Sequence, residues 1–107
     1  MRALDIIKVL MTSEPLKMEI INSYDFLTPS QKFEIDSIAW DTYYKLYNAK
    51  LEFNLGLQYE DVKTGKELLG DDFYARALKK TDKQIKDEFN KSLISENISI
   101  ARKAMEK

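Results

Sequence analysis

The sequence predicts an all-α fold, with about five helices packed round one long central helix at roughly residues 29–64, in the manner of a helical bundle. The chain of 107 residues has only 3 Gly and 2 Pro, whereas a sheet protein needs turn residues every few positions. Good helix formers such as Leu, Lys, Glu and Ala fill the stretches between these breakers. Apolar residues make up 44% of the chain, enough for one modest core, so we expect a single helical domain over residues 1–107.

The first two helices are predicted from capping residues and apolar spacing. Residues 3–11 form the first helix. Ser13 is a good N-cap for the second helix because its hydroxyl can accept a hydrogen bond from a free backbone amide, and Pro15 suits a first turn. From Leu16 onward, apolar residues recur at helical spacing, so the second helix is expected to reach about Phe26.

The long helix has the clearest boundaries in the chain. Residues Thr28 to Gln31 have the pattern of a capping box, in which each of these two side chains bonds the backbone amide of the other residue. From there to Thr64 the only helix breaker is Gly56, so we expect a helix well beyond the mean length of about 11–12 residues. Gly65 is expected to follow its end, because glycine readily adopts the left-handed backbone conformation found there.

The remaining residues predict two further helices. Asp71 can cap a short fourth helix, and the capping-box pattern recurs at Thr81–Gln84, so a fifth helix is expected to begin there. The apolar stripe of this fifth helix shifts near Ser95, which means either a bend or contact with two neighbours in succession. The stripe before the shift comprises Ile85, Phe89 and Leu93, and the stripe after it comprises Ile94, Ile98, Ala101 and Met105.

The long helix carries two apolar faces when its residues are placed 100° apart. One face collects Ile35, Ile38, Ala39, Thr42, Leu46, Ala49, Phe53 and Leu57. A second, nearly opposite face collects Phe33, Trp40, Tyr44, Tyr47, Leu51, Leu55 and Val62, with Tyr43 at its edge. A helix with two apolar faces cannot be a simple surface helix, so each face needs a covering partner.

The aromatic face has two interpretations. Either other helices of the chain cover it as core, or it contacts another protein chain, itself in a homo-oligomer or a larger assembly. Trp and Tyr suit an interface because they bury much area at low entropy cost and keep a polar tip. Four shorter helices would also struggle to cover both faces of so long a helix. The predicted contact residues are Trp40, Tyr43, Tyr44, Tyr47 and Leu51.

Residue types that many enzymes and metal sites need are missing. The chain has no Cys and no His, which removes thiolate chemistry, the commonest general base near neutral pH and the commonest transition-metal ligand. The acidic residues Glu34, Asp41 and Glu52 fall on the polar sector of the long helix, as a solvated face does. We therefore expect no enzymatic activity, no cofactor and no metal. With no apolar stretch of membrane-spanning length, we also expect no membrane contact and a cytoplasmic location.

A basic cluster supports an alternative function. Five cations recur along residues 76–86: Arg76, Lys79, Lys80, Lys83 and Lys86. Such a stripe could follow the phosphates of a nucleic acid, although the break expected at Thr81 would interrupt it and acidic neighbours such as Asp82 fit a plain solvated face. Net charge is −5 over residues 1–75 and +4 over residues 76–107, which could orient self-association or a partner. The leading prediction is a small adaptor, regulator or assembly subunit, and the alternative is a nucleic-acid-binding regulatory protein.

Overall fold

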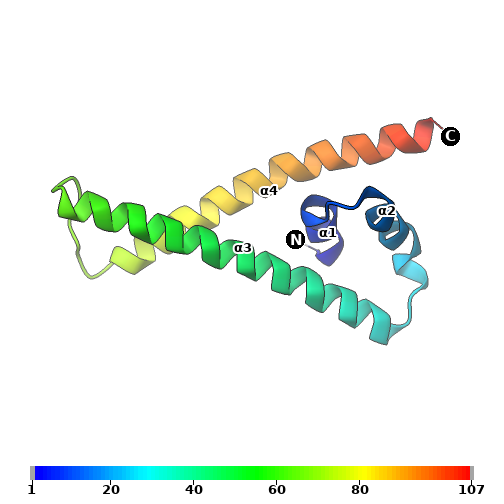
Figure 1. The fold of residues 1–107 in the computed structure, drawn as a ribbon, viewed down its shortest axis with the longest axis horizontal. Helices are drawn as coiled ribbons and strands as arrows, with labels where there is room; N and C mark the ends of the chain where they lie inside the picture. The colour runs from blue at the N-terminus through cyan, green and yellow to red at the C-terminus, as the bar shows by residue number, and fades with distance from the viewer. Residues whose placement is uncertain (1, 107) are drawn as a thin grey trace. The chain divides into compact units, whose positions relative to one another are not determined.

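The structure is a computed structural model that describes residues 2–106, and its regular elements are all helical. Four α-helices occur in this part of the chain, labelled in Figure 1: α1 (Ala3–Leu10), α2 (Glu14–Ser23), α3 (Pro29–Lys63) and α4 (Phe73–Met105). A short 3₁₀ turn, η1 (Tyr24–Phe26), follows α2. The all-α class and the long helix are therefore confirmed.

The ends of α3 form as the sequence predicts. The Thr28 amide donates to Gln31 Oε1 at 3.0 Å, and the Gln31 amide donates to Thr28 Oγ1 at 3.2 Å, so both halves of the capping box are present. At the other end Gly65 has a φ of 81°, and the Lys66 amide bonds the Asp61 carbonyl oxygen at 2.8 Å. This backbone pattern satisfies carbonyl groups that the helix end would otherwise leave unpaired.

The helix break expected at Thr81 is wrong. Helix α4 runs without interruption through this position, so the described residues hold four α-helices in place of about five. Thr81 Oγ1 donates to the Ala77 carbonyl oxygen at 2.8 Å, a bond to the preceding turn that is compatible with a helix interior. Gln84 bonds a side chain of α3 and makes no capping box, because its Oε1 accepts a hydrogen bond from Asn54 Nδ2.

The chain divides into two compact units. We call residues Tyr44–Glu88 the hairpin unit, and the described residues up to Tyr43 together with those from Phe89 onward the α1/α2 unit. The division by itself does not test whether residues 1–107 fold as one domain, so the single domain stays a prediction.

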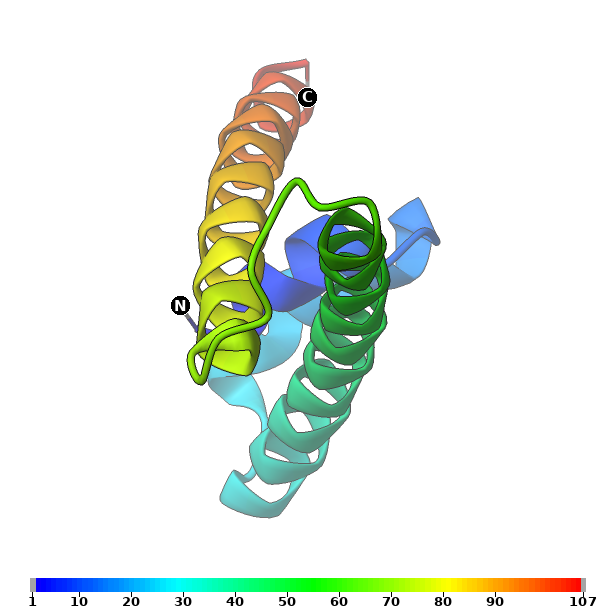
Figure 2. The same cartoon turned by 90° about the vertical axis from the view of Figure 1, so that its left-hand side faces the viewer.

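The hairpin unit consists of the second half of α3, a loop and the first half of α4, and the two helix halves run in opposite directions (Figure 1). Figure 2 shows the unit from the end where the loop joins them. Its interior is partly polar, since Asn54, Gln58 and Thr81 are as buried as the apolar side chains beside them. Asn54 Nδ2 donates to Thr81 Oγ1 at 2.9 Å and Gln58 Nε2 donates to the Phe73 carbonyl oxygen at 2.7 Å. These bonds satisfy the buried amides, which makes their burial tolerable.

The α1/α2 unit has a more apolar interior. Ala3, Ile6 and Ile7 of α1 are buried, as are Ala39 of α3 and Phe89 of α4. Within this unit α1 lies between the first part of α3 and the last part of α4 (Figure 1). Burial of such side chains is the main favourable term in folding, so α1, with three buried apolar residues, contributes to the stability of this unit.

Candidate interaction surfaces

The two apolar faces of α3 have opposite surroundings in the hairpin unit. The inner face contains Leu51, only 8% exposed, and turns toward α4 together with the buried amides of Asn54 and Gln58. The outer α3 stripe, roughly opposite on the helix, is open to solvent, with Phe53 61% exposed. This stripe comprises Leu46, Ala49, Phe53 and Leu57. The face that the sequence analysis did not choose for a partner is thus the more exposed one here.

The predicted aromatic contact residues are divided between the two units. Trp40 and Tyr43 belong to the α1/α2 unit and are half-buried. The Trp40 and Tyr43 rings meet edge to face at 5.5 Å between centroids, and Tyr43 meets Phe89 of α4 in the same way at 5.6 Å. Edge-to-face contacts of this kind stabilise packed aromatic side chains, so these two residues contribute to the interior of the unit.

The other three predicted contact residues lie in the hairpin unit. Leu51 is buried, whereas Tyr47 is half-buried and its hydroxyl donates to Asp82 Oδ1 at 2.5 Å. Tyr44 is 56% exposed. Of the five residues, Tyr44 has the most open surface for a partner, and the assignment of all five to an interface stays a prediction.

The five predicted nucleic-acid contacts also differ from one another. Arg76 orders the loop before α4, because its Nη1 lies 2.9 Å from Asp72 Oδ1 and its Nη2 donates to the Leu68 carbonyl oxygen at 2.6 Å. Its Nε lies 3.3 Å from Glu67 Oε1 in an ion pair. The four lysines are exposed, and we call Lys79, Lys80, Lys83 and Lys86 the lysine stripe. Since α4 is continuous, Lys79, Lys83 and Lys86 share one helix face.

A second exposed apolar stripe lies near the end of α4, in the α1/α2 unit. After the shift near Ser95, the stripe of Ile94, Ile98, Ala101 and Met105 is exposed along its length. Helix α4 is continuous through Ser95, so the two stripes belong to one helix. They differ in how deeply their side chains are buried. Phe89 before the shift is buried, whereas Met105 after it is 86% exposed.

Sequence reasoning missed a buried lysine in α2. Leu16, where the apolar spacing that predicts this helix begins, is 48% exposed, whereas Lys17 beside it is 2% exposed. Lys17 Nζ lies 3.0 Å from Glu96 Oε2 and 3.1 Å from Glu14 Oε1, and Lys103 Nζ lies 2.8 Å from Glu14 Oε2. This network joins α2 to α4, and nothing in the local pattern of α2 points to Glu96.

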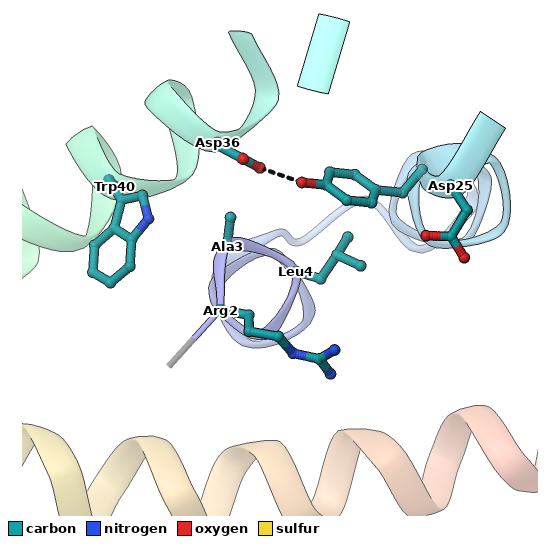
Figure 3. Close-up of a pocket in the computed structure, with 7 residues that line it drawn as sticks. Arg2, Ala3, Leu4, Asp25, Asp36 and Trp40 are labelled. Carbon is teal, nitrogen blue, oxygen red and sulfur yellow. Dashed lines mark hydrogen bonds between the residues drawn. The ribbon is translucent and has the colours of Figure 1, made fainter. Parts of the chain in front are cut away.

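A cavity of about 350 Å³ in the α1/α2 unit was also missed (Figure 3). Its lining comes from the start of α1 and its N-cap, from η1, and from α3, segments that only the fold brings together. The lining residues are Arg2, Ala3, Leu4, Tyr24, Asp25, Asp36 and Trp40. The Tyr24 hydroxyl donates to Asp36 Oδ1 at 2.8 Å, and this bond raises the pKa of Tyr24 above its ordinary value of 10.0 because it favours the protonated phenol.

Metal and membrane sites were sought among residues 2–106. No group of acidic side chains in this range is arranged to hold a metal ion. None of the helices described is both long and apolar enough to cross a bilayer. Comparison of the chain with models of protein families, with curated proteins and with solved structures finds no match.

Proposed function

We propose that this chain is a non-enzymatic protein–protein interaction module: a small adaptor, regulator or subunit of a larger assembly. The observation that carries the proposal is the imbalance between exposed and buried apolar side chains. Among residues 2–106, fifteen large apolar side chains are exposed, including Phe53 and Ile94, whereas the buried ones are few. Contiguous exposed apolar patches are uncommon on monomeric proteins and are typical of interaction sites.

The outer α3 stripe is the contact surface that the geometry favours. Its side chains repeat along several turns of one helix, so a partner helix or strand laid along it would cover them together. The inner face already packs against α4 through Leu51, Asn54 and Gln58 within the hairpin unit. A partner on the outer stripe would leave this packing intact.

The partner that we propose to test first is a second copy of the chain. Residues 1–75 carry a net charge of −5 and residues 76–107 carry +4, so two copies arranged with opposite charges together would attract each other. The alternative partner is a different protein, in a larger assembly, whose surface would cover the outer α3 stripe. We also propose a cytoplasmic location, which the absence of cysteine supports.

Sedimentation equilibrium of the purified chain tests this proposal. We expect a mass that rises with concentration, and we expect Phe53→Glu to return it to that of one chain, because the new carboxylate would be desolvated in the interface. Asn48→Glu is the matched control: it adds the same charge to α3 at an exposed position outside the stripe and should leave association unchanged. Equal loss in both variants would contradict a role for the stripe.

If the chain stays monomeric at all concentrations, the partner to be tested is a different protein. The wild-type chain and the same two variants would then be used to capture partners from nuclease-treated native lysate. We expect a stoichiometric protein that is recovered with wild type and Asn48→Glu and lost with Phe53→Glu. Recovery that is the same for all three chains would overturn the stripe as the contact surface.

The second candidate function is nucleic-acid binding through the lysine stripe. It is favoured by the continuity of α4, which places three exposed lysines on one helix face, and none of the four has an ion-pair partner within residues 2–106. Replacing Lys79, Lys83 and Lys86 by Gln should weaken binding to DNA or RNA and reduce its salt slope by about one for each lysine that contacts a phosphate. The same replacement at Lys45, Lys66 and Lys91 controls for lost charge. Binding that does not respond to salt would contradict this function.

A further inference from the structure

The cavity beside Trp40 combines an aromatic wall with an acidic lining. Trp40 closes one side, and Asp36 lies one helical turn away from it on α3 (Figure 3). Asp25 adds a second carboxylate from the segment between α2 and α3. The cavity volume of about 350 Å³ lies near the lower end of the range for small-molecule sites, which suits one side chain or a small ligand.

One carboxylate of the cavity has unused bonding capacity. Asp36 Oδ1 accepts the Tyr24 hydroxyl at 2.8 Å, which fixes the orientation of the carboxylate, and Asp36 Oδ2 has no hydrogen-bond partner within residues 2–106. An ionised carboxylate can accept several hydrogen bonds, so this second oxygen can receive a donor from a ligand. A charged donor would form the stronger bond.

The cations near the cavity do not satisfy this site. Arg2 lines the cavity, but its side chain is 80% exposed, its Nε lies 4.0 Å from Asp5 Oδ2, and in Figure 3 it points away from Asp36. Lys32 Nζ lies over the Tyr24 ring, 5.5 Å from its centroid. Neither of these two cations therefore forms an ion pair with Asp36, and Asp25, the second carboxylate in the lining, is exposed.

We propose that this cavity binds an arginine side chain presented by a partner protein. The guanidinium would stack against Trp40 and donate to Asp36 Oδ2, a combination that a planar cation with several N–H donors makes better than an ammonium does. This inference rests on the proposed function, because the arginine belongs to a protein partner, and it adds the chemistry by which that partner is recognised.

Trp40 supplies a direct probe, since it is the only Trp in the chain. The purified chain is titrated with N-acetyl-arginine amide and, separately, with N-acetyl-citrulline amide, at constant ionic strength, while Trp fluorescence is recorded. The two compounds have nearly the same shape and differ in charge. We expect a saturable fluorescence change with the arginine compound and none with the citrulline compound.

Two variants locate the binding. Asp36→Asn keeps an oxygen that accepts the Tyr24 hydroxyl but removes the charge, and it should weaken binding about tenfold or more. Asp41→Asn removes the same charge from an exposed position of α3 that does not line the cavity, and should leave binding unchanged. Circular dichroism checks that both variants keep their helices.

The titration separates this inference from the proposed function. A saturable response to the citrulline compound, no response to the arginine compound, or equal binding by Asp36→Asn and wild type would each overturn the arginine site, whatever the association measurements show. If the arginine compound binds as expected but no protein partner requires Asp36, the cavity takes a free guanidinium ligand and the partner-borne arginine is contradicted.

Discussion

The α1/α2 unit and the hairpin unit contain parts of the same two helices, α3 and α4, yet their interiors differ in chemistry. In the α1/α2 unit the buried side chains are mainly apolar, such as Ile6 and Phe89. In the hairpin unit the buried amide of Asn54 bonds both Thr81 and Gln84. A polar interior requires a particular alignment of the helices, because a shift along the axis would leave the amide unpaired, whereas an apolar interior gains chiefly from the area it buries.

The largest effect is expected from breaking the apolar interior. Phe89→Ala removes a ring that is 4% exposed and that contacts Tyr43, so it should lower the free energy of unfolding by about 3–5 kcal/mol. Urea denaturation followed by circular dichroism measures the change. Tyr74→Ala, at a 55% exposed ring of the same helix, is the control and should have a much smaller effect. Equal losses would contradict the burial of Phe89.

A smaller loss is expected from the polar interior. Asn54→Ala removes two hydrogen bonds, one of them to the buried Thr81 hydroxyl, and should lower the free energy of unfolding by about 1–3 kcal/mol. Asn48→Ala removes an exposed amide from the same helix and should change it by less than about 0.5 kcal/mol. If the two variants were equally stable, the Asn54 bonds would contribute nothing to the hairpin unit.

The lysine network of the α1/α2 unit makes stability depend on pH at both extremes. Hydrogen bonds from Lys103 and Lys17 lower the pKa of Glu14 below 4.5, so its contribution is present above pH 4.5 and lost as the pH falls through the lower folded value. Burial tends to lower the pKa of Lys17, but the hydrogen bonds to Glu96 and Glu14 outweigh it and raise that pKa above 10.5. The contribution of Lys17 is therefore present below pH 10.5 and lost as the pH rises through the higher folded value.

Urea denaturation across the acid range tests the Glu14 part of this network. The free energy of unfolding should fall as the pH drops below 4.5, and Glu14→Gln should make that fall shallower. The effect is expected to be modest because Glu14 is exposed and solvent screens its charge. Glu19→Gln changes an exposed carboxylate of the same helix and is the control. An acid-side slope that Glu14→Gln and Glu19→Gln alter equally would contradict the network.

The smallest effect is a gain in stability in the hairpin unit. Gly56 lies inside α3, and a Cβ added there would meet nothing within 4 Å. Gly56→Ala should therefore raise the free energy of unfolding by about 0.5–1 kcal/mol, because alanine loses less conformational entropy in a helix. A thermal or urea melt measures the gain, and a loss of stability would mean that this part of α3 does not form a regular helix.

The sequence predicts those parts of the fold that depend on neighbouring residues. Thr28 and Gln31 cap α3 as expected, and Gly65 follows its end, because these bonds form within a few residues of chain. Thr81 and Gln84 have the same local pattern but a different role, because Asn54, 27 residues before Thr81, bonds both of them. No local pattern contains that information.

Prediction of the candidate sites from the sequence is limited in the same way, because they depend on residues that lie far apart in the chain. The sequence identifies two apolar faces on α3, but which face is covered in the hairpin unit depends on where α4 lies. The Trp40 cavity could not be predicted, because Arg2, Tyr24 and Asp36 come from three separate segments. The sequence predicted the lysine stripe together with Arg76 as one basic cluster. That Arg76 instead bonds the Leu68 carbonyl oxygen could not be predicted, because the path of the loop is not evident from the sequence.

Helix α3 has one covered and one exposed apolar face in the hairpin unit, and a paired substitution tests this difference most directly. The free energy of unfolding is measured for Leu51→Ala and Phe53→Ala, at a concentration low enough that the chain is monomeric. Leu51 is 8% exposed and Phe53 61% exposed, so Leu51→Ala should lose about 2–5 kcal/mol and Phe53→Ala less than about 0.5 kcal/mol. A larger loss for Phe53→Ala than for Leu51→Ala would show that the outer α3 stripe is covered within the chain, which would contradict its exposure to solvent.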